Sequence, residues 1–192
     1  MSRFFFLRHG ESSANVAGLI ASAPANAAAA YGLTPRGRDQ VRRAVENARA
    51  AGELAGVQLV FSSPLLRALE SASIAAEVLG AEIHVDPRLI ERGFGSLELS
   101  SDHNYEQVWG ADRIDPTHEQ WGVESVASVL ARVHGLFVER EAEAQPGPLL
   151  LCTHGDVASV ALCAGYGQPI GTHRDVGALA NGEIRGLPAA LP

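Results

Sequence analysis

Apolar residues along the chain form two kinds of pattern that alternate. Short runs typical of strands occur at residues 4–7, 57–61, 82–85 and 149–152, and each stops at a polar or turn-forming segment. Apolar residues at helical spacing predict helices that begin near residues 35, 65, 125 and 157. Strands that alternate with helices predict an α/β fold, a three-layer α/β/α sandwich with a mainly parallel central sheet.

Capping residues support the predicted helices. Thr34 is an N-cap residue followed by proline at the first helical position, and Gly52 follows the last periodic residue. Ser125 is the expected N-cap of the third helix, which the sequence QPGP at 145–148 is expected to end. The N-terminal apolar run breaks at Arg8, so it is too short for a signal peptide or a membrane span and is expected to be a strand.

Two segments lack a clear period. Residues 21–31 are rich in alanine and contain Pro24, which predicts a flexible surface loop or a short turn. Residues 92–122 form a long irregular stretch, which we interpret as a small insertion that covers the site. The length of 192 residues and the 46% hydrophobic content predict a single domain over residues 1–192 with a sizeable core.

Composition narrows the range of functions. The net charge of -7 argues against nucleic acid or an anionic membrane as partner, because both select clustered positive charge. All 15 basic residues are arginine, and a chain without lysine cannot form a Schiff base, attach pyridoxal phosphate or supply a Walker-A lysine. Cys152 and Cys163 form neither a disulfide framework nor a CxxC metal pair, which predicts a reducing, cytoplasmic location.

Arginine and histidine side chains follow three of the predicted strands. Arg8 and His9 end the first strand, Arg67 comes after the second and His154 follows the fourth. Because ligands bind beyond the carboxyl ends of parallel strands, these four residues should converge into an anion site. Arg67 and Gly155 lie in the first turns of predicted helices, where free N–H groups and the helix dipole also favour a phosphate.

This set of residues suits phosphoryl transfer without a metal. A neutral His9 imidazole can attack phosphorus through one ring nitrogen while a backbone carbonyl holds the other. Arg8, Arg67 and His154 would stabilise the charge on the equatorial oxygens. The leaving oxygen needs a carboxylic acid with a raised pKa, and Glu91, which follows the third strand, is the expected acid.

The same residues resemble the histidine phosphatase superfamily, in its phosphoglycerate mutase-like branch. The resemblance covers most of the chain and rests on four ordered segments: LRHGES at 7–12, FSSPLLRA at 61–68, LIERGFG at 89–95 and THG at 153–155. It implies a phosphoglycerate mutase-like fold, a phosphohistidine formed on His9, and a place for Asn15 in phosphate binding. In the family's other branch an aspartate directly follows the second histidine. Here Gly155 intervenes, which favours Glu91 as the acid and leaves Asp156 in reserve.

Several further residues were weighed against ordinary structural roles. Leu99 and Ser71 stand where relatives commonly carry glycine and threonine, and neither change removes a reacting group, although Leu99 could reshape the entrance. The remaining expectations are ordinary surface positions for His103 and His118, hence no metal site, and packing of the insertion against the domain for Trp109 and Trp121.

Two polar loop residues and the two thiols were also candidates for the site. Asn15 and Ser22 lie where a loop could close over the phosphate, and Asn15 has the better claim by motif. A cysteine phosphatase is excluded, because neither Cys152 nor Cys163 has the arginine six positions later that would cradle a phosphate.

Three functions follow from these observations. The leading hypothesis is a metal-independent phosphatase that hydrolyses a small phosphorylated metabolite through a phosphohistidine and needs no cofactor. The alternative is a phosphoglycerate mutase, which depends on 2,3-bisphosphoglycerate and must exclude water; family mutases usually have a longer insertion and a C-terminal tail over the site. The third is a non-catalytic phosphate-binding or interaction module. The substrate, and whether the chain forms a homodimer, stay open.

Overall fold

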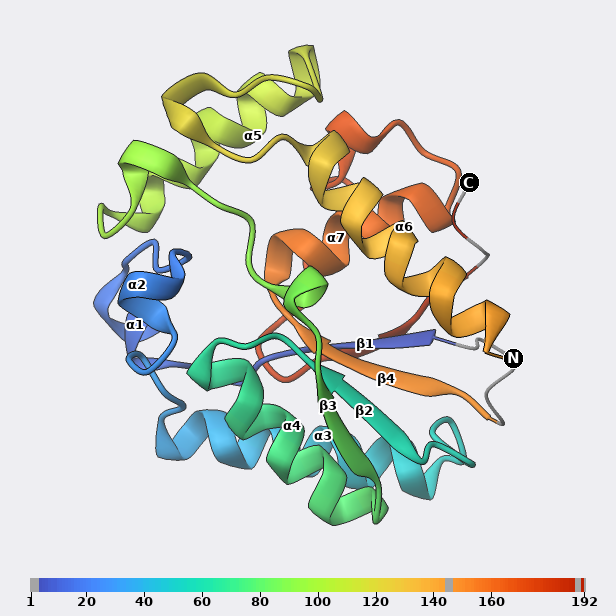
Figure 1. Ribbon diagram of the computed structural model, residues 1–192. Coiled ribbons are helices and arrows are strands. Elements are labelled where there is room, and N and C mark those ends of the chain that lie inside the picture. The colour runs from blue at the N-terminus through green and yellow to red at the C-terminus, as the bar shows by residue number, and fades with distance from the viewer. Residues whose placement is uncertain (1–3, 144–146, 189–190, 192) are drawn as a thin grey trace.

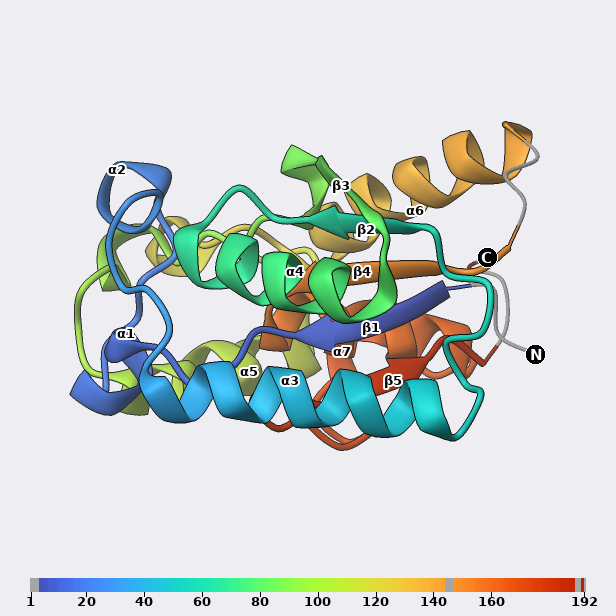
Figure 2. The ribbon, with the colours of Figure 1, turned by 90° about the horizontal axis from the view of Figure 1, so that it is seen from below.

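A single five-stranded sheet organises the chain in the computed structural model, which describes residues 4–143, 147–188 and 191. The strands lie in the order β3-β2-β4-β1-β5, which Figure 2 shows from below. Their bounds are β1 (Phe4–Arg8), β2 (Leu59–Ser62), β3 (Glu82–Val85), β4 (Leu149–Thr153) and β5 (Ile184–Gly186). The first four strands are parallel and were predicted, whereas β5 pairs antiparallel with β1 and was not.

Helices cover both faces of the sheet, which confirms the three-layer prediction (Figure 1). One face carries α3 (Pro35–Ala50) and α4 (Leu66–Leu79), and the other carries α6 (Val126–Ala142) and α7 (Gly155–Gly165). Three further helices gather at the end of the sheet away from the N-terminus: α1 (Ser13–Ala17), α2 (Pro24–Ala27) and α5 (Tyr105–Ile114). Among the described residues, no helix has the length and apolar character that a bilayer span requires.

The predicted caps are present. The Thr34 side chain accepts a hydrogen bond from the Gly37 backbone at 3.0 Å, and the Ser125 side chain accepts one from Ser128 at 3.2 Å. The predicted end of α6 at 145–148 falls partly on residues 144–146, which lie outside the described residues, as do residues 1–3 of the N-terminal run.

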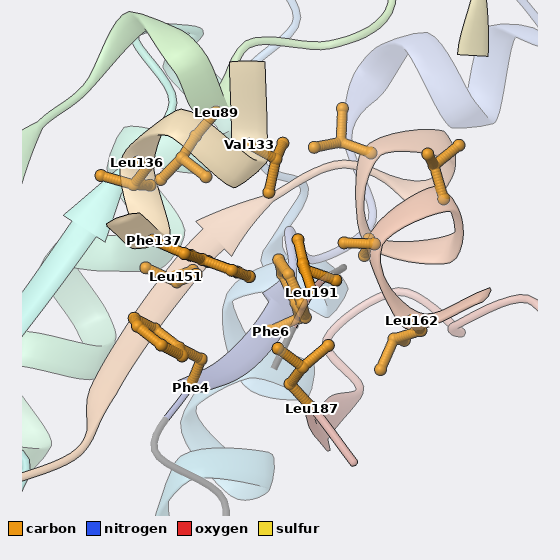
Figure 3. Packing of buried hydrophobic residues seen from close by; sticks show 14 of the residues in the cluster. Phe4, Phe6, Leu89, Val133, Leu136, Phe137, Leu151, Leu162, Leu187 and Leu191 are labelled. Atoms are coloured by element: carbon orange, nitrogen blue, oxygen red, sulfur yellow. The ribbon is translucent and has the colours of Figure 1, made fainter. Parts of the chain in front are cut away.

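Alternate side chains of the central strands pack into two hydrophobic cores, one on each face of the sheet. Phe4 and Phe6 of β1 pack towards α6 and α7, whereas Phe5 and Leu7 pack towards α3 and α4. Figure 3 shows the first core, where the rings of Phe4 and Phe137 stack with their centroids 4.2 Å apart. Both faces of β1 are therefore buried, which explains the continuous apolar run in the sequence.

The alanine-rich segment at residues 21–31, predicted as a flexible surface loop or a short turn, is largely exposed and includes a single helical turn. It contains α2, and Ala21 and Ala27 are buried in a small cluster with Leu65. The Glu98 carboxylate accepts hydrogen bonds from the backbone N–H groups of Ser22 and Ala23 at 2.9 and 3.0 Å. Only Ala21 and Ala27 of these alanines are buried, whereas Ala25 and residues 28–30 are exposed.

The insertion at residues 92–122 is also more regular than predicted, because it contains α5 and several single helical turns. Val108 of α5 and Phe94 are fully buried in a cluster of their own. His103 is exposed, as expected, but the expectation of a surface position for His118 was wrong. Its ring is buried, and Nε2 lies 2.9 Å from Oδ1 of Asp112.

Candidate active site

Strand ends bring the predicted site residues together around one cavity of about 210 Å³. Arg8 ends β1 and is followed by His9, Arg67 lies in the first turn of α4 after β2, and Gly155 begins α7 after β4. The cavity is lined by six of the predicted residues, namely Arg8, His9, Asn15, Arg67, Glu91 and Gly155. The His154 ring lies behind His9, with the two ring centroids 5.1 Å apart.

Glycine at position 10 allows the loop after β1 to pass close to α3. A Cβ atom on Gly10 would lie 2.2 Å from the carbonyl oxygen of Gly37. No side chain fits there, so the close approach of Gly10 and Gly37 fixes the direction in which the chain leaves His9.

The two ring nitrogens of His9 have different partners. Nδ1 lies 2.8 Å from the Gly10 carbonyl oxygen, and Arg67 donates from Nε to Nε2 at 3.1 Å. Because guanidinium can only donate, Nε2 carries the lone pair and Nδ1 carries the hydrogen. Burial, followed by the charges of Arg67 and Arg8, lowers the pKa of His9 well below its usual value. The ring is therefore neutral, with an unprotonated nitrogen beside two cations.

Arg8 and Arg67 each keep one buried nitrogen without a hydrogen-bond acceptor among the described residues. Arg8 donates from Nη1 to the Leu179 carbonyl at 2.6 Å but leaves Nε unpaired, and Arg67 donates from Nη2 to the Ala21 carbonyl at 2.8 Å but leaves Nη1 unpaired. Buried donors without acceptors are costly unless a ligand satisfies them. Their position on the cavity points to an anion.

Ser63, which the sequence reasoning missed, holds the second histidine. It follows β2 directly, and its Oγ lies 2.7 Å from Nε2 of His154. Nδ1 of His154 has no hydrogen-bond partner among the described residues and lies 3.8 Å from Oε2 of Glu91. Burial, and then the charge of Arg67, lowers the pKa of His154 well below its usual value, so this ring is neutral as well.

Glu91 is buried beside the histidines. Its Oε1 accepts a hydrogen bond from the Arg92 backbone at 2.9 Å, whereas the Arg92 side chain pairs with Asp112. Burial, and then the Asp156 carboxylate, raise the pKa of Glu91 to about 7. Glu91 can therefore hold a proton near neutral pH.

Asp156, the reserve candidate for the acid, has the opposite protonation tendency. Burial raises its pKa, but His173, Arg92 and Arg174 outweigh burial and lower the pKa below its usual value. The Trp109 indole also donates to Asp156 at 3.1 Å. An ionised carboxylate cannot give a proton to a leaving group, so the geometry favours Glu91.

The outer wall of the cavity comes partly from the insertion. Tyr105 and Trp109 of α5 stack with ring centroids 5.2 Å apart, and the Arg174 guanidinium lies 3.8 Å from the Trp109 ring centroid. Trp109 thus packs the insertion against α7 through Asp156, as expected, and also lines the cavity. Tyr105 and Arg174 carry no motif that could have identified them from sequence.

Of the two polar loop residues, Asn15 lies at the cavity and Ser22 does not. Asn15 lines the cavity, and its Oδ1 accepts a hydrogen bond from the Ser12 backbone at 3.0 Å. Ser22 is buried away from the cavity lining and donates to Glu98 at 2.6 Å, so its role is to hold α2. Trp121 lies beside His118, with ring centroids 6.3 Å apart.

The described part of the chain shows neither a cluster of metal ligands nor an activated thiol. The residues described contain no group of three or more histidine, cysteine or acidic side chains placed to hold a metal. Cys152 and Cys163 are buried and free, and burial raises the pKa of both thiols. Neither thiol has the lowered pKa that a nucleophile needs.

Comparisons with known proteins agree with this geometry. Residues 4–187 match the sequence model of the histidine phosphatase superfamily, branch 1. A 2,3-bisphosphoglycerate-dependent phosphoglycerate mutase of Thermoplasma acidophilum is 32% identical over 164 residues, which cover 81% of this chain and 72% of that protein.

Solved structures share the fold. A mycobacterial glucosyl-3-phosphoglycerate phosphatase, solved with VO3, superposes with a TM-score of 0.79 at 26% identity, covering 96% of this chain and 90% of that one. The alpha-ribazole phosphatase of Shigella flexneri gives a TM-score of 0.71 at 20% identity, covering 98% of this chain and 96% of that one. At that identity the second likeness concerns the fold alone.

Proposed function

The chain belongs to branch 1 of the histidine phosphatase superfamily and is a phosphoryl-transfer enzyme by that membership, and we propose that it is a metal-independent phosphomonoesterase for a small phosphorylated metabolite. One observation carries the proposal. The unprotonated Nε2 of His9 lies on a cavity where Arg8 and Arg67 each present a buried N–H group without an acceptor. A phosphate satisfies both groups and brings phosphorus to the nucleophile.

The first half-reaction transfers the phosphoryl group to His9. Nε2 attacks phosphorus as the bond from phosphorus to the ester oxygen breaks, and Glu91 gives its proton to that oxygen, so the free alcohol leaves. Arg8 and Arg67 stabilise the charge on the equatorial oxygens. The single N–H of the neutral His154 ring and the backbone N–H groups at the start of α7 add to this stabilisation.

The second half-reaction regenerates the enzyme. Glu91, now a carboxylate, takes a proton from water as the water oxygen attacks phosphorus and the bond to Nε2 breaks. Inorganic phosphate leaves, and His9 and protonated Glu91 are restored. Nδ1 of His9 keeps its hydrogen bond to the Gly10 carbonyl throughout, which fixes the tautomer in both steps.

Hydrolysis of p-nitrophenyl phosphate in EDTA tests this function. Wild-type protein should release p-nitrophenol with the chelator present, and His9→Ala should lose all turnover. Replacing the exposed His103 by alanine is the matched control and should leave the rate unchanged. Wild-type inactivity over a broad panel of phosphoesters would favour the non-catalytic binding module instead.

A phosphoglycerate mutase is the second candidate, because the Thermoplasma relative carries that name at 32% identity. A mutase must keep water from the phosphohistidine and pass the group to a second substrate. Incubation with 3-phosphoglycerate and a trace of 2,3-bisphosphoglycerate separates the two. Formation of 2-phosphoglycerate faster than release of phosphate would contradict the phosphatase proposal.

A further inference from the structure

The lining of the cavity contains a half-buried carboxylate that no described group pairs with. Asp102 lies on the cavity lining, at the start of the helical turn that leads into α5. Its side chain makes no hydrogen bond or ion pair with any residue that the structure describes, whereas its backbone N–H donates to the Gly18 carbonyl at 2.9 Å. The backbone contact holds Asp102 in place on the cavity lining.

The other charged groups on the cavity wall balance one another once a phosphate is bound. Arg8 and Arg67 face the phosphate dianion, and Arg174 is paired with Asp156 at 3.3 Å. Glu91 is protonated and therefore uncharged at the start of the reaction. Behind the wall, Arg92 pairs with Asp112.

The charge left over is therefore that of Asp102. We propose that Asp102 is a specificity-determining residue that selects phosphate monoesters whose alcohol part carries no negative charge. This inference rests on the proposed phosphatase function and deepens it. A hydroxyl or ammonium group on the leaving alcohol can donate to the free carboxylate. A carboxylate or a second phosphate beside Asp102 would be repelled.

A matched pair of substrates isolates this effect. Glycerol 3-phosphate and 3-phosphoglycerate differ only in a hydroxymethyl group against a carboxylate. The wild-type kcat/KM for glycerol 3-phosphate should exceed that for 3-phosphoglycerate by about tenfold or more, given the energy of like charges close together in a partly buried site. Raising the ionic strength should shrink the ratio, because salt screens exposed charges.

Asp102→Asn provides the decisive variant. It should shift the substrate ratio towards 3-phosphoglycerate by about tenfold, since the amide keeps the shape of the side chain and removes its charge. Glu106→Gln is the control, because it removes one exposed negative charge from α5, which directly follows the turn that contains Asp102, at a residue outside the cavity lining. The control should leave the ratio unchanged.

The outcomes separate this inference from the proposed function. A wild-type preference for 3-phosphoglycerate, or a ratio that Asp102→Asn leaves as it was, overturns the role of Asp102 while p-nitrophenyl phosphate hydrolysis still stands. Absence of hydrolysis of every ester, p-nitrophenyl phosphate included, overturns the phosphatase function and the inference together.

Discussion

Among single residues, Glu91 should set the alkaline limb of the pH profile. Burial and the Asp156 carboxylate raise its pKa to about 7, so the carboxyl keeps its proton below that pH and loses it above. Because the acid form is needed, kcat/KM should fall as pH rises through about 7. For an alkyl phosphate, Glu91→Gln should lower kcat/KM by about 10²–10⁴-fold and abolish the limb. The kcat/KM for p-nitrophenyl phosphate, whose leaving group needs little protonation, should fall much less; an unchanged limb in the variant would count against Glu91.

Leu99 adopts a backbone conformation that suits glycine better. Its φ is 61°, in the left-handed region, and its side chain is 43% exposed, so little packing compensates. Left-handed backbone costs a branched residue about 1–2 kcal/mol, and glycine loses about 0.5–1 kcal/mol through its greater freedom when unfolded. Leu99→Gly should therefore raise the free energy of unfolding by up to about 1 kcal/mol. Leu99→Ala keeps the strain and loses the side chain; an equal gain there would refute the backbone explanation.

Among the elements, α2 depends on a side chain from the insertion. Glu98 accepts hydrogen bonds from the Ser22 and Ala23 backbones and from the Asn26 side chain, whereas α2 has no side-chain cap of its own. Burial raises the pKa of Glu98, but these bonds outweigh it and lower the pKa, so Glu98 is ionised at neutral pH.

Removing the Glu98 carboxylate should destabilise α2 and, through the Ala21 carbonyl, the position of Arg67. Glu98→Ala should lower the free energy of unfolding by about 1–3 kcal/mol, the usual cost of hydrogen bonds to a charged group. Backbone amides of residues 21–27 should exchange hydrogen faster, and KM should rise because the Ala21 carbonyl holds Arg67. Glu53→Ala, at an exposed residue, is the control. Unchanged exchange in 21–27 would show that α2 stands without Glu98.

The limits of sequence prediction also appear at the level of elements. β1 and β4 were predictable because both of their faces are buried and give unbroken apolar runs. β3 is exposed along its length and was predicted only as a short run before Asp86 and Pro87. β5 has three residues, all half-buried, which is too short for a period of two to show. α2 and α5 were missed because each has too few buried apolar residues to show a helical period. In α2 the buried residue is Ala27, and in α5 the buried apolar residue is Val108.

The candidate site divides in the same way. Residues that follow strands, such as Arg8 and His154, could be placed at one sheet edge from topology alone. Asp102 and Arg174 reach the cavity from loops and the insertion, whose path depends on tertiary contacts that no local pattern encodes. His118 was placed on the surface because its partner, Asp112, is six residues away and becomes close only when α5 folds back.

In the molecule as a whole, a buried charge network joins the insertion to α7 and to the approach to α6. Arg92 is fully buried and pairs with both carboxylate oxygens of Asp112 at 2.7 Å. It also donates to the Glu124 carbonyl at 2.6 Å and lies 3.5 Å from Asp156. The network therefore connects α5 and the start of α7, which both contribute residues to the cavity lining, with the approach to α6.

Asp112→Leu should destabilise the protein far more than an ordinary surface change. It leaves the Arg92 guanidinium buried without its main counter-charge, and breaking a buried pair costs about 3–5 kcal/mol of unfolding free energy. Replacing both partners, as Arg92→Met with Asp112→Leu, removes the uncompensated charge and should recover at least half of that loss, because apolar residues of similar volume often serve as well as a buried ion pair. Glu119→Gln, at an exposed residue of the insertion whose side chain has no partner among the described residues, is the matched control and should change stability by no more than about 0.5 kcal/mol. Denaturant titration of the four proteins measures these differences. A double variant no more stable than Asp112→Leu would mean that the hydrogen bond from Arg92 to Glu124, which the double variant also loses, matters as much as the unpaired charge.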